Sequence, residues 1–182
     1  MRAAILVEGV TDVLAVESMA RRLGRDLEAE GVTVVSLGGG GGLQAELVRL
    51  GPTGQGVELL GLCDIDHEKR WARRLERAGL GHDLDREAME DLGFFVCDRD
   101  LEDELIRALG VEATERVIAA EGDLHSFQTL TKQPYHRDGS RHDQLRRFFT
   151  SQSGRKRYIP LLVDALEPGK EPRPLREVLA RV

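Results

Sequence analysis

The sequence predicts an α/β fold in which a parallel sheet of four strands, flanked by helices, is followed by a helical C-terminal extension. Four short apolar runs alternate with helical patterns, which is typical of parallel sheets with right-handed crossovers. Each run is nearly continuous, as expected for a strand that is covered on both faces. Only helical patterns follow residue 100. We therefore predict a sheet-containing domain over residues 1–110 and a basic helical extension over residues 111–182.

The predicted strands cover residues 3–7, 32–37, 59–63 and 93–97. The first crossover has a helical pattern at 11–24, with Thr11 as its cap and Gly24 at its end. Further helices are expected at 43–50, 67–78, 101–109, 111–121, 124–131, 141–150 and 155–166. The arginine-rich helix at 67–78 has Trp71 and Leu75 on one face. The polar segment QPYHRDGSRHD predicts a loop, and a last short helix should follow EPGKEPRP.

Composition and processing signals favour a cytoplasmic protein with no membrane contact. No apolar run approaches the roughly 20 residues of a membrane span. Acids follow the first apolar run at once, unlike the pattern of a signal peptide. Cys63 and Cys97 end apolar runs, so they predict small buried residues rather than a disulfide framework.

The net charge of −6 is unevenly distributed along the chain. Residues 1–124 contain 14 Lys and Arg against 26 Asp and Glu, whereas residues 125–182 contain 12 against 6. Such a split is compatible with two tasks, the holding of metal ions and the holding of phosphates. Two solvated surfaces would explain it equally well.

The glycine run GGGGG at residues 38–42 ends the second predicted strand. It is not a P-loop, because Leu43 and Gln44 follow it in place of Lys and Ser or Thr. Its spacing also differs from that of a dinucleotide-binding fingerprint. The run is either a flexible loop or a backbone that permits the close approach of a ligand.

Acidic residues follow three of the four predicted strands. In an open parallel sheet, ligands bind outside the carboxyl ends of the strands. The acids at these ends are Glu8 after the first strand, Asp64 and Asp66 after the third, and Asp98, Asp100 and Glu102 after the fourth. Asp64 and Asp66 should point to one side while the chain is extended. Asp12 lies four residues after Glu8, in the first turn of a helix, where a negative charge is favourable.

Carboxylates that are crowded together either have raised pKa values or hold a cation between them. Oxygen ligands of this kind suit Mg²⁺ or Mn²⁺, and no cluster of Cys and His suggests zinc. Other roles are open at the fourth strand: Asp100 is also a candidate helix cap, and Asp103 and Glu104 suit a solvated first turn. Whether Asp98 and Asp100 take part in the site is left open.

The motifs VEGVTD (7–12) and CDIDHE (63–68) together resemble the Toprim domain. That domain is shared by topoisomerases of types IA and II, bacterial primases, recombination mediators and the overcoming-lysogenization-defect (OLD) nucleases. The resemblance implies a Toprim, Rossmann-like sheet over about residues 1–110. Within this superfamily the chain is most similar to the OLD type. The residues that carry this similarity are LVEGVTDVLA, the DLE motif at 100–102, and GRKRYIPLLVDAL, which includes Lys156.

The OLD resemblance implies a metal-dependent endonuclease, a hydrolase that nicks or cleaves phosphodiester bonds with two Mg²⁺ or Mn²⁺ ions. It implies metal ligation by Glu8, Asp12, Asp64, Asp66 and Glu102. The implied catalytic residues are Glu8, Asp64 and Asp66, with Lys156 assisting. DNA is the expected partner. Its backbone could be contacted by Arg141, Arg146, Arg147, Arg155 and Arg157, although solubility alone would also explain these arginines.

The chain departs from OLD proteins in one respect, since it contains no Walker motif and begins two residues before the first predicted strand. OLD proteins carry an ATPase domain before the Toprim part, so we expect that the ATPase is here a separate chain, that it is not needed, or that the activity has drifted. The oligomeric state is left open, with a homodimer as one option. Alternative functions are primase-like nucleotidyl transfer and a non-catalytic Toprim module that binds nucleic acid or a partner. A haloacid dehalogenase phosphatase also uses D-x-D, but after its first strand rather than its third.

Overall fold

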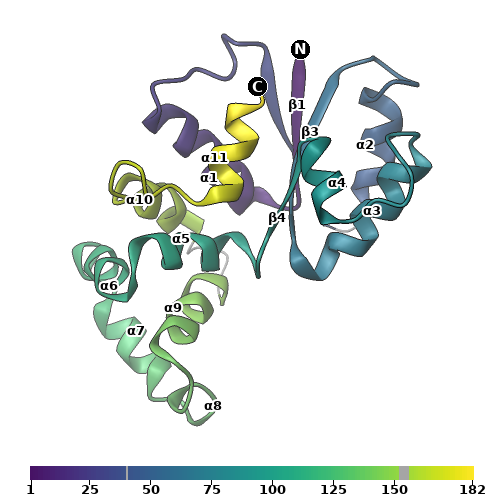
Figure 1. The fold of residues 1–182 in the computed structure, drawn as a ribbon. Helices are drawn as coiled ribbons and strands as arrows, with labels where there is room; N and C mark the ends of the chain where they lie inside the picture. Colours follow the sequence, from purple (N-terminus) through teal and green to yellow (C-terminus); the bar gives the residue numbers. More distant parts are fainter. Residues whose placement is uncertain (40, 152–155) are drawn as a thin grey trace. The chain divides into compact units, whose positions relative to one another are not determined.

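The computed structural model describes residues 1–39, 41–151 and 156–182 and confirms the predicted α/β architecture. One sheet contains four parallel strands in the order β2-β1-β3-β4 (Figure 1). The strands are β1 (Ala3–Val7), β2 (Val32–Ser36), β3 (Glu58–Asp64) and β4 (Phe94–Cys97). Because β2 and β3 lie on opposite sides of β1, the winding direction changes between β1 and β3. Ligands of open α/β sheets bind at such a switch point.

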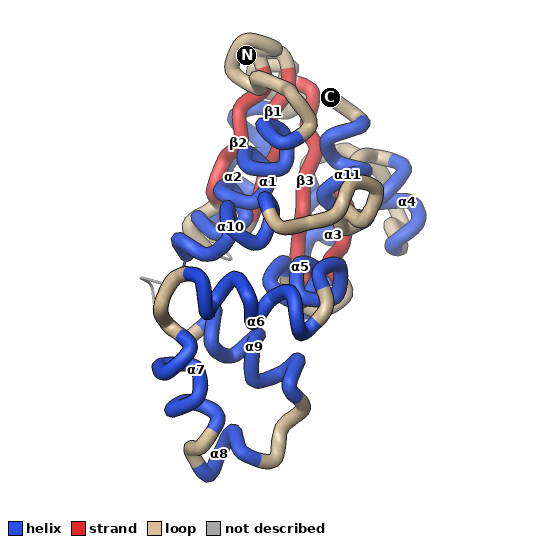
Figure 2. Tube along the Cα trace, turned by 90° about the vertical axis from the view of Figure 1, so that its left-hand side faces the viewer, coloured by secondary structure: helices blue, strands red, loops and turns tan. Residues whose placement is uncertain are grey.

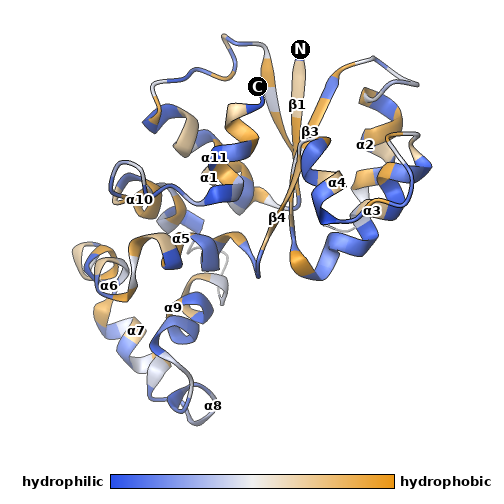
Figure 3. Cartoon of the chain, viewed as in Figure 1, coloured by the Kyte–Doolittle hydropathy of each residue, from blue (hydrophilic) through white to orange (hydrophobic). Residues whose placement is uncertain are grey.

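Helices cover both faces of the sheet, which explains why the strands read as continuous apolar runs. On one side lie α1 (Val10–Arg22) and α11 (Arg173–Ala180), and on the other α2 (Gly42–Leu50), α3 (Glu68–Arg77) and α4 (Arg86–Asp91) (Figure 1). All five residues of β1 are completely buried, and its hydrophobic colour in Figure 3 agrees with this position. The sequence did not reveal α4, because its six residues contain a single buried apolar side chain, Met89.

Among the described residues from 101 to 172, helices joined by loops are the only regular secondary structure, as Figure 2 shows. They are α5 (Leu101–Leu109), α6 (Val111–Ala120), α7 (Leu124–Thr131), α8 (Pro134–Arg137), α9 (Arg141–Thr150) and α10 (Tyr158–Asp164). The short helix α8 lies in the segment that was predicted to be a loop. It is a single turn with Pro134 in its first position, where the missing N–H of proline costs no hydrogen bond.

The chain forms two compact units. The first unit contains Met1–Leu101 and Arg173–Val182, and the second contains Glu102–Pro172. This division by compactness differs from the boundary at residue 110 drawn from the sequence. The reason is α11, whose buried Leu175, Val178 and Leu179 return the end of the chain to β3, β4 and α1.

Aromatic residues form the core of the second unit. The ring of Phe148 lies 5.3 Å from that of Phe127 and 5.9 Å from that of Tyr158, measured between centroids. Phe149 packs against both Phe148 and Tyr158. The Tyr158 hydroxyl donates a hydrogen bond of 2.7 Å to Asp123. These buried rings fill the interior of the unit and are not exposed for stacking on bases.

Both cysteines, Cys63 and Cys97, are buried free thiols, as predicted. Within the described ranges, no helix is both long enough and apolar enough to cross a membrane.

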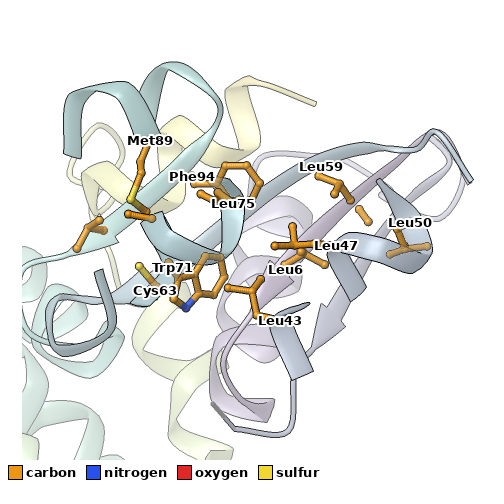
Figure 4. Packing of buried hydrophobic residues seen from close by; sticks show 13 residues of the cluster. Leu6, Leu43, Leu47, Leu50, Leu59, Cys63, Trp71, Leu75, Met89 and Phe94 are labelled. Carbon is orange, nitrogen blue, oxygen red and sulfur yellow. The ribbon is translucent and has the colours of Figure 1, made fainter. Parts of the chain in front are cut away.

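A cluster of buried residues fixes α3 against the sheet (Figure 4). Trp71 of α3 is only 2% exposed and meets the ring of Phe94 edge-on at 6.2 Å. This close approach requires a glycine at position 61 of β3. A Cβ atom there would lie 2.7 Å from Trp71 and 2.9 Å from Phe94. Gly61 therefore sets the distance between the arginine-rich helix and the sheet.

Substitution of Gly61 by alanine should destabilise the fold by about 1–3 kcal/mol, because the added methyl group overpacks the cluster around Trp71. The free energy of unfolding in urea measures this effect. Gly41→Ala is the matched control, since Gly41 has an ordinary helical φ of −91° and no atom within 4 Å of the added Cβ. Equal stability of the Gly61→Ala variant and wild type would contradict the packing described here.

Candidate functional site: a carboxylate cluster at the edge of the sheet

The ends of β1 and β3 bring two acids together at the switch point of the sheet. Glu8 directly follows β1, and Asp64 is the last residue of β3. These strands are neighbours, paired from Ala3 with Glu58 to Leu6 with Gly61. The backbone N–H of Asp64 donates a hydrogen bond of 3.3 Å to Oε1 of Glu8. The adjacency of the two motifs, 56 residues apart in the chain, thus follows from strand pairing.

His67 is the second partner of Glu8. Its ring nitrogen Nδ1 contacts Oε2 of Glu8, and the side chains are 35% and 17% exposed, respectively. His67 ends the 3-10 turn η1 (Ile65–His67), which follows β3 directly. Sequence reasoning did not assign this histidine a role. The available signal was its position three residues after Asp64, one turn further along the chain.

Asp12 lies in the first turn of α1 and faces back toward the end of β1. Its Oδ2 accepts a hydrogen bond of 2.7 Å from the backbone N–H of Gly9, which is the N-cap of the helix. The predicted cap, Thr11, instead lies inside α1, which begins at Val10. Burial, and then the negative charges of Glu8 and Asp100, raise the pKa of Asp12 from 3.8 to about 6, although the bond from Gly9 opposes this shift.

Glu8, Asp12 and Asp64 line one small hollow. The remaining lining is apolar or weakly polar and comprises Leu62, Cys63, Cys97 and Leu101. Such surroundings strengthen the repulsion between carboxylates. In the described part of the chain, no three His, Cys, Asp or Glu side chains are arranged so that they could hold a metal ion. The three acids therefore line a hollow with no room for a water molecule, and they do not form a ready-made coordination shell.

The other acids of the predicted cluster lie in different surroundings. Asp66 is exposed and lies in η1, so the alternation expected from an extended chain ends at Asp64. Asp98 is also exposed and accepts a hydrogen bond of 3.2 Å from Arg86, which in turn pairs with Glu68 at 2.7 Å. Asp100 is buried and acts electrostatically on Asp12. Asp100 thus belongs to the electrostatic surroundings of the hollow, which the sequence had left open.

Glu102 begins the second unit, in the first turn of α5. It is 8% exposed, and the neighbouring acids Asp103 and Glu104 are also buried. Asp103 accepts hydrogen bonds from His142 at 2.8 Å and from Arg107 at 2.9 Å. The expectation of a solvated first turn is therefore wrong for Asp103 and Glu104. The predicted ligation of a metal by Glu102 stays a prediction.

Among the predicted DNA-binding arginines, Arg141 and Arg157 have identified partners inside the second unit. Arg141 pairs with Glu115, and its guanidinium lies 4.4 Å from the centre of the Phe127 ring. Arg157 donates a hydrogen bond of 2.7 Å to Asp123 and lies over the ring of Tyr158. Both side chains therefore help to hold the unit together.

The other basic residues of the prediction have different positions. Arg147 is exposed on α9 and lines a polar hollow with His125, Gln133 and His136. Arg146 is partly buried, and Lys156 is exposed just before α10. Arg155 lies outside the described residues.

Residues 1–66 match the family model described as "Overcoming lysogenization defect protein-like, TOPRIM domain". The chain contains an OLD-like Toprim domain. The matched range includes both acidic motifs, from Glu8 to Asp66.

Solved structures of OLD proteins resemble the chain over nearly its whole length. The C-terminal region of the Xanthomonas campestris pv. campestris OLD protein is 28% identical, with a TM-score of 0.76. The match covers 100% of this chain and 91% of that one. The C-terminal region of the Burkholderia pseudomallei OLD protein is 24% identical with a TM-score of 0.75, covering 98% and 95%, and supports the fold alone. The comparison with curated proteins gives no match.

The pKa of Asp12 predicts a stability that depends on pH in the metal-free protein. A carboxyl group with a higher pKa in the folded than in the unfolded chain stabilises the fold only while it is protonated. Its contribution is complete below about pH 4 and is lost as the pH rises through about 6. The shift from 3.8 to about 6 corresponds to about 3 kcal/mol.

Urea denaturation in the presence of a chelator, between pH 4 and pH 7, measures this change. Asp12→Asn should remove most of it and should make the protein more stable than wild type at pH 7. Glu17→Gln, which removes an exposed acid of the same helix, should keep the pH profile of wild type. A wild-type profile in Asp12→Asn would show that Asp12 is not the titrating group.

Proposed function

We propose that the protein is a metal-dependent DNA nuclease that hydrolyses phosphodiester bonds at the carboxylate cluster. The observation that carries this proposal is the convergence of Glu8, Asp12 and Asp64 on one hollow at the switch point of the sheet. The OLD-like Toprim domain supports a nucleic-acid-processing enzyme independently of this geometry. DNA is accordingly the proposed substrate.

The donor set of the hollow fits Mg²⁺ or Mn²⁺. All three acids offer carboxylate oxygens, the ligands that these hard cations prefer. The raised pKa of Asp12 means that its negative charge is costly, first because of burial and then because of the charges of Glu8 and Asp100, so a cation would be bound favourably. When bound, such ions activate water for attack and stabilise the charge that develops on the phosphoryl group and the leaving oxygen. We propose that two ions bind, as in other two-metal nuclease sites.

Each of the proposed site residues has a separate role. Glu8 and Asp64 form the part of the ligand set whose position is fixed, because the backbone N–H of Asp64 donates a hydrogen bond to the Glu8 carboxylate. Asp12 and Asp66 complete it from α1 and η1. Glu102 and Lys156 of the second unit would add a ligand and a positive charge that stabilises the transition state.

Contacts with the DNA backbone come from arginines in the second unit. Arg147 is the best suited of the predicted set, because it is exposed beside a polar hollow. Arg141 and Arg157 would first have to leave their partners, Glu115 and Asp123. Binding through such contacts weakens with salt and depends little on base sequence. A separate ATPase chain remains a further proposed partner.

His67 should support metal binding by orienting the Glu8 carboxylate. Loss of a group that hydrogen-bonds a ligating carboxylate typically lowers metal affinity about 10–100-fold. Titration of Mn²⁺ by calorimetry into His67→Ala measures this loss, with the exposed His82→Ala as control. Affinity equal to wild type, or higher, would mean that His67 does not support the site.

The nuclease activity itself is tested by nicking of supercoiled plasmid with Mg²⁺ or Mn²⁺. Glu8→Gln and Asp64→Asn should each lower the rate at least about 100-fold, since each removes a charged oxygen ligand from the pair that is hydrogen-bonded. A chelator should abolish the activity, and Glu17→Gln should retain it.

The same assay separates the alternatives. Incorporation of labelled nucleoside triphosphates without nicking would identify a nucleotidyl transferase. Retained DNA binding with neither reaction would identify a non-catalytic binding module. Nicking at the wild-type rate by Glu8→Gln would contradict the proposed site.

A further inference from the structure

The arginine-rich helix α3 carries positive charge that the proposed chemistry does not yet use. Its basic residues are Lys69, Arg70, Arg73, Arg74 and Arg77. The two acids of the helix are engaged elsewhere: Glu68 pairs with Arg86 at 2.7 Å, and Glu76 accepts a hydrogen bond of 2.9 Å from the backbone of Leu84. Five basic residues against two acids leave α3 with an excess of positive charge.

Two of these arginines share a narrow hollow with Glu8. Arg70 and Arg74 line it together with Trp71, and the glycine run contributes Gly39. The acidic hollow described above also contains Glu8 but is otherwise lined by different residues, including Asp12 and Asp64. Glu8 thus lines both hollows, the acidic one and the one lined by arginines.

Packing fixes this arrangement. Trp71 is buried over Gly61, so the turn of α3 that carries Arg70 is held against the sheet (Figure 4). Arg74 follows one turn later and therefore lies on the same side of the helix. Both are partly buried, whereas Arg77 is exposed. Arg70 makes no side-chain hydrogen bond or ion pair with any other residue that the structure describes.

We propose that Arg70 and Arg74 bind phosphate groups of the nucleic-acid strand beside Glu8, so that a phosphodiester is held next to the carboxylate cluster. This inference rests on the proposed function and deepens it. A guanidinium group matches the geometry of a phosphate and binds it in a bidentate manner. The first 124 residues carry an excess of acids, so a polyanion needs local positive charge to approach them.

Binding of a fluorescein-labelled DNA duplex, measured by anisotropy with Ca²⁺ in place of Mg²⁺ or Mn²⁺, tests the proposal on the full chain. Arg70→Gln and Arg74→Gln should each weaken binding about tenfold or more. Each should also lower the slope of log affinity against log salt by about 1. The matched control is Arg77→Gln, which removes the same charge from the same helix two turns beyond Arg70 and should weaken binding less than about threefold. Equal losses in Arg70→Gln and Arg77→Gln would overturn the proposal.

Parallel plasmid nicking separates this inference from the proposed function. If wild type does not nick but the Arg70 and Arg74 variants lose DNA binding, the nuclease proposal fails and the phosphate site stands. If wild type nicks and Arg70→Gln binds and nicks like Arg77→Gln, only the phosphate site fails. If thermal denaturation shows that Arg70→Gln is not folded at the assay temperature, Arg70→Lys replaces it in the binding test. It keeps the charge but loses the bidentate geometry, so it should bind severalfold more weakly, and wild-type affinity would overturn the proposal.

Discussion

The pairing of β1 with β3 is the constraint on which the site depends. It sets Glu8 beside Asp64, and the backbone of Asp64 donates a hydrogen bond to the Glu8 carboxylate. β1 itself is completely buried. Glu8 directly follows this strand, so the buried strand holds the backbone of Glu8 in place at the edge of the sheet. Asp12 joins the pair through the turn at Gly9. Burial first, and then repulsion from the neighbouring carboxylates, raises the pKa of Asp12.

Charge is organised differently in the two units. In the first unit the acids gather at the ends of the strands, and the arginines of α3 lie next to Glu8. In the second unit, Arg141 and Arg157 pair with acids around an aromatic core. Part of the positive charge of the C-terminal region is therefore paired with acids of that unit, although both guanidinium groups stay exposed to solvent. The first unit has positive charge of its own on α3, close to Glu8.

The sequence predicted the sheet and its acidic edge because both follow from local patterns. Continuous apolar runs identify buried strands, and acids at their ends identify the edge. The contact between His67 and Glu8 could not be predicted, because it depends on the 3-10 turn that ends the extended conformation at Asp64. That turn also places Asp66 outside the strand. The neighbourhood of Arg70 and Glu8 depends on packing of Trp71 over Gly61, a long-range contact without a local sequence signal.

Crystals of the full chain soaked in Mn²⁺ would test the central claim most directly. Anomalous scattering locates the ion independently of any activity assay. The account predicts a peak within coordination distance of the carboxylates of both Glu8 and Asp64. A peak bound elsewhere, or ordered carboxylates at this edge with no peak at saturating Mn²⁺, would contradict it.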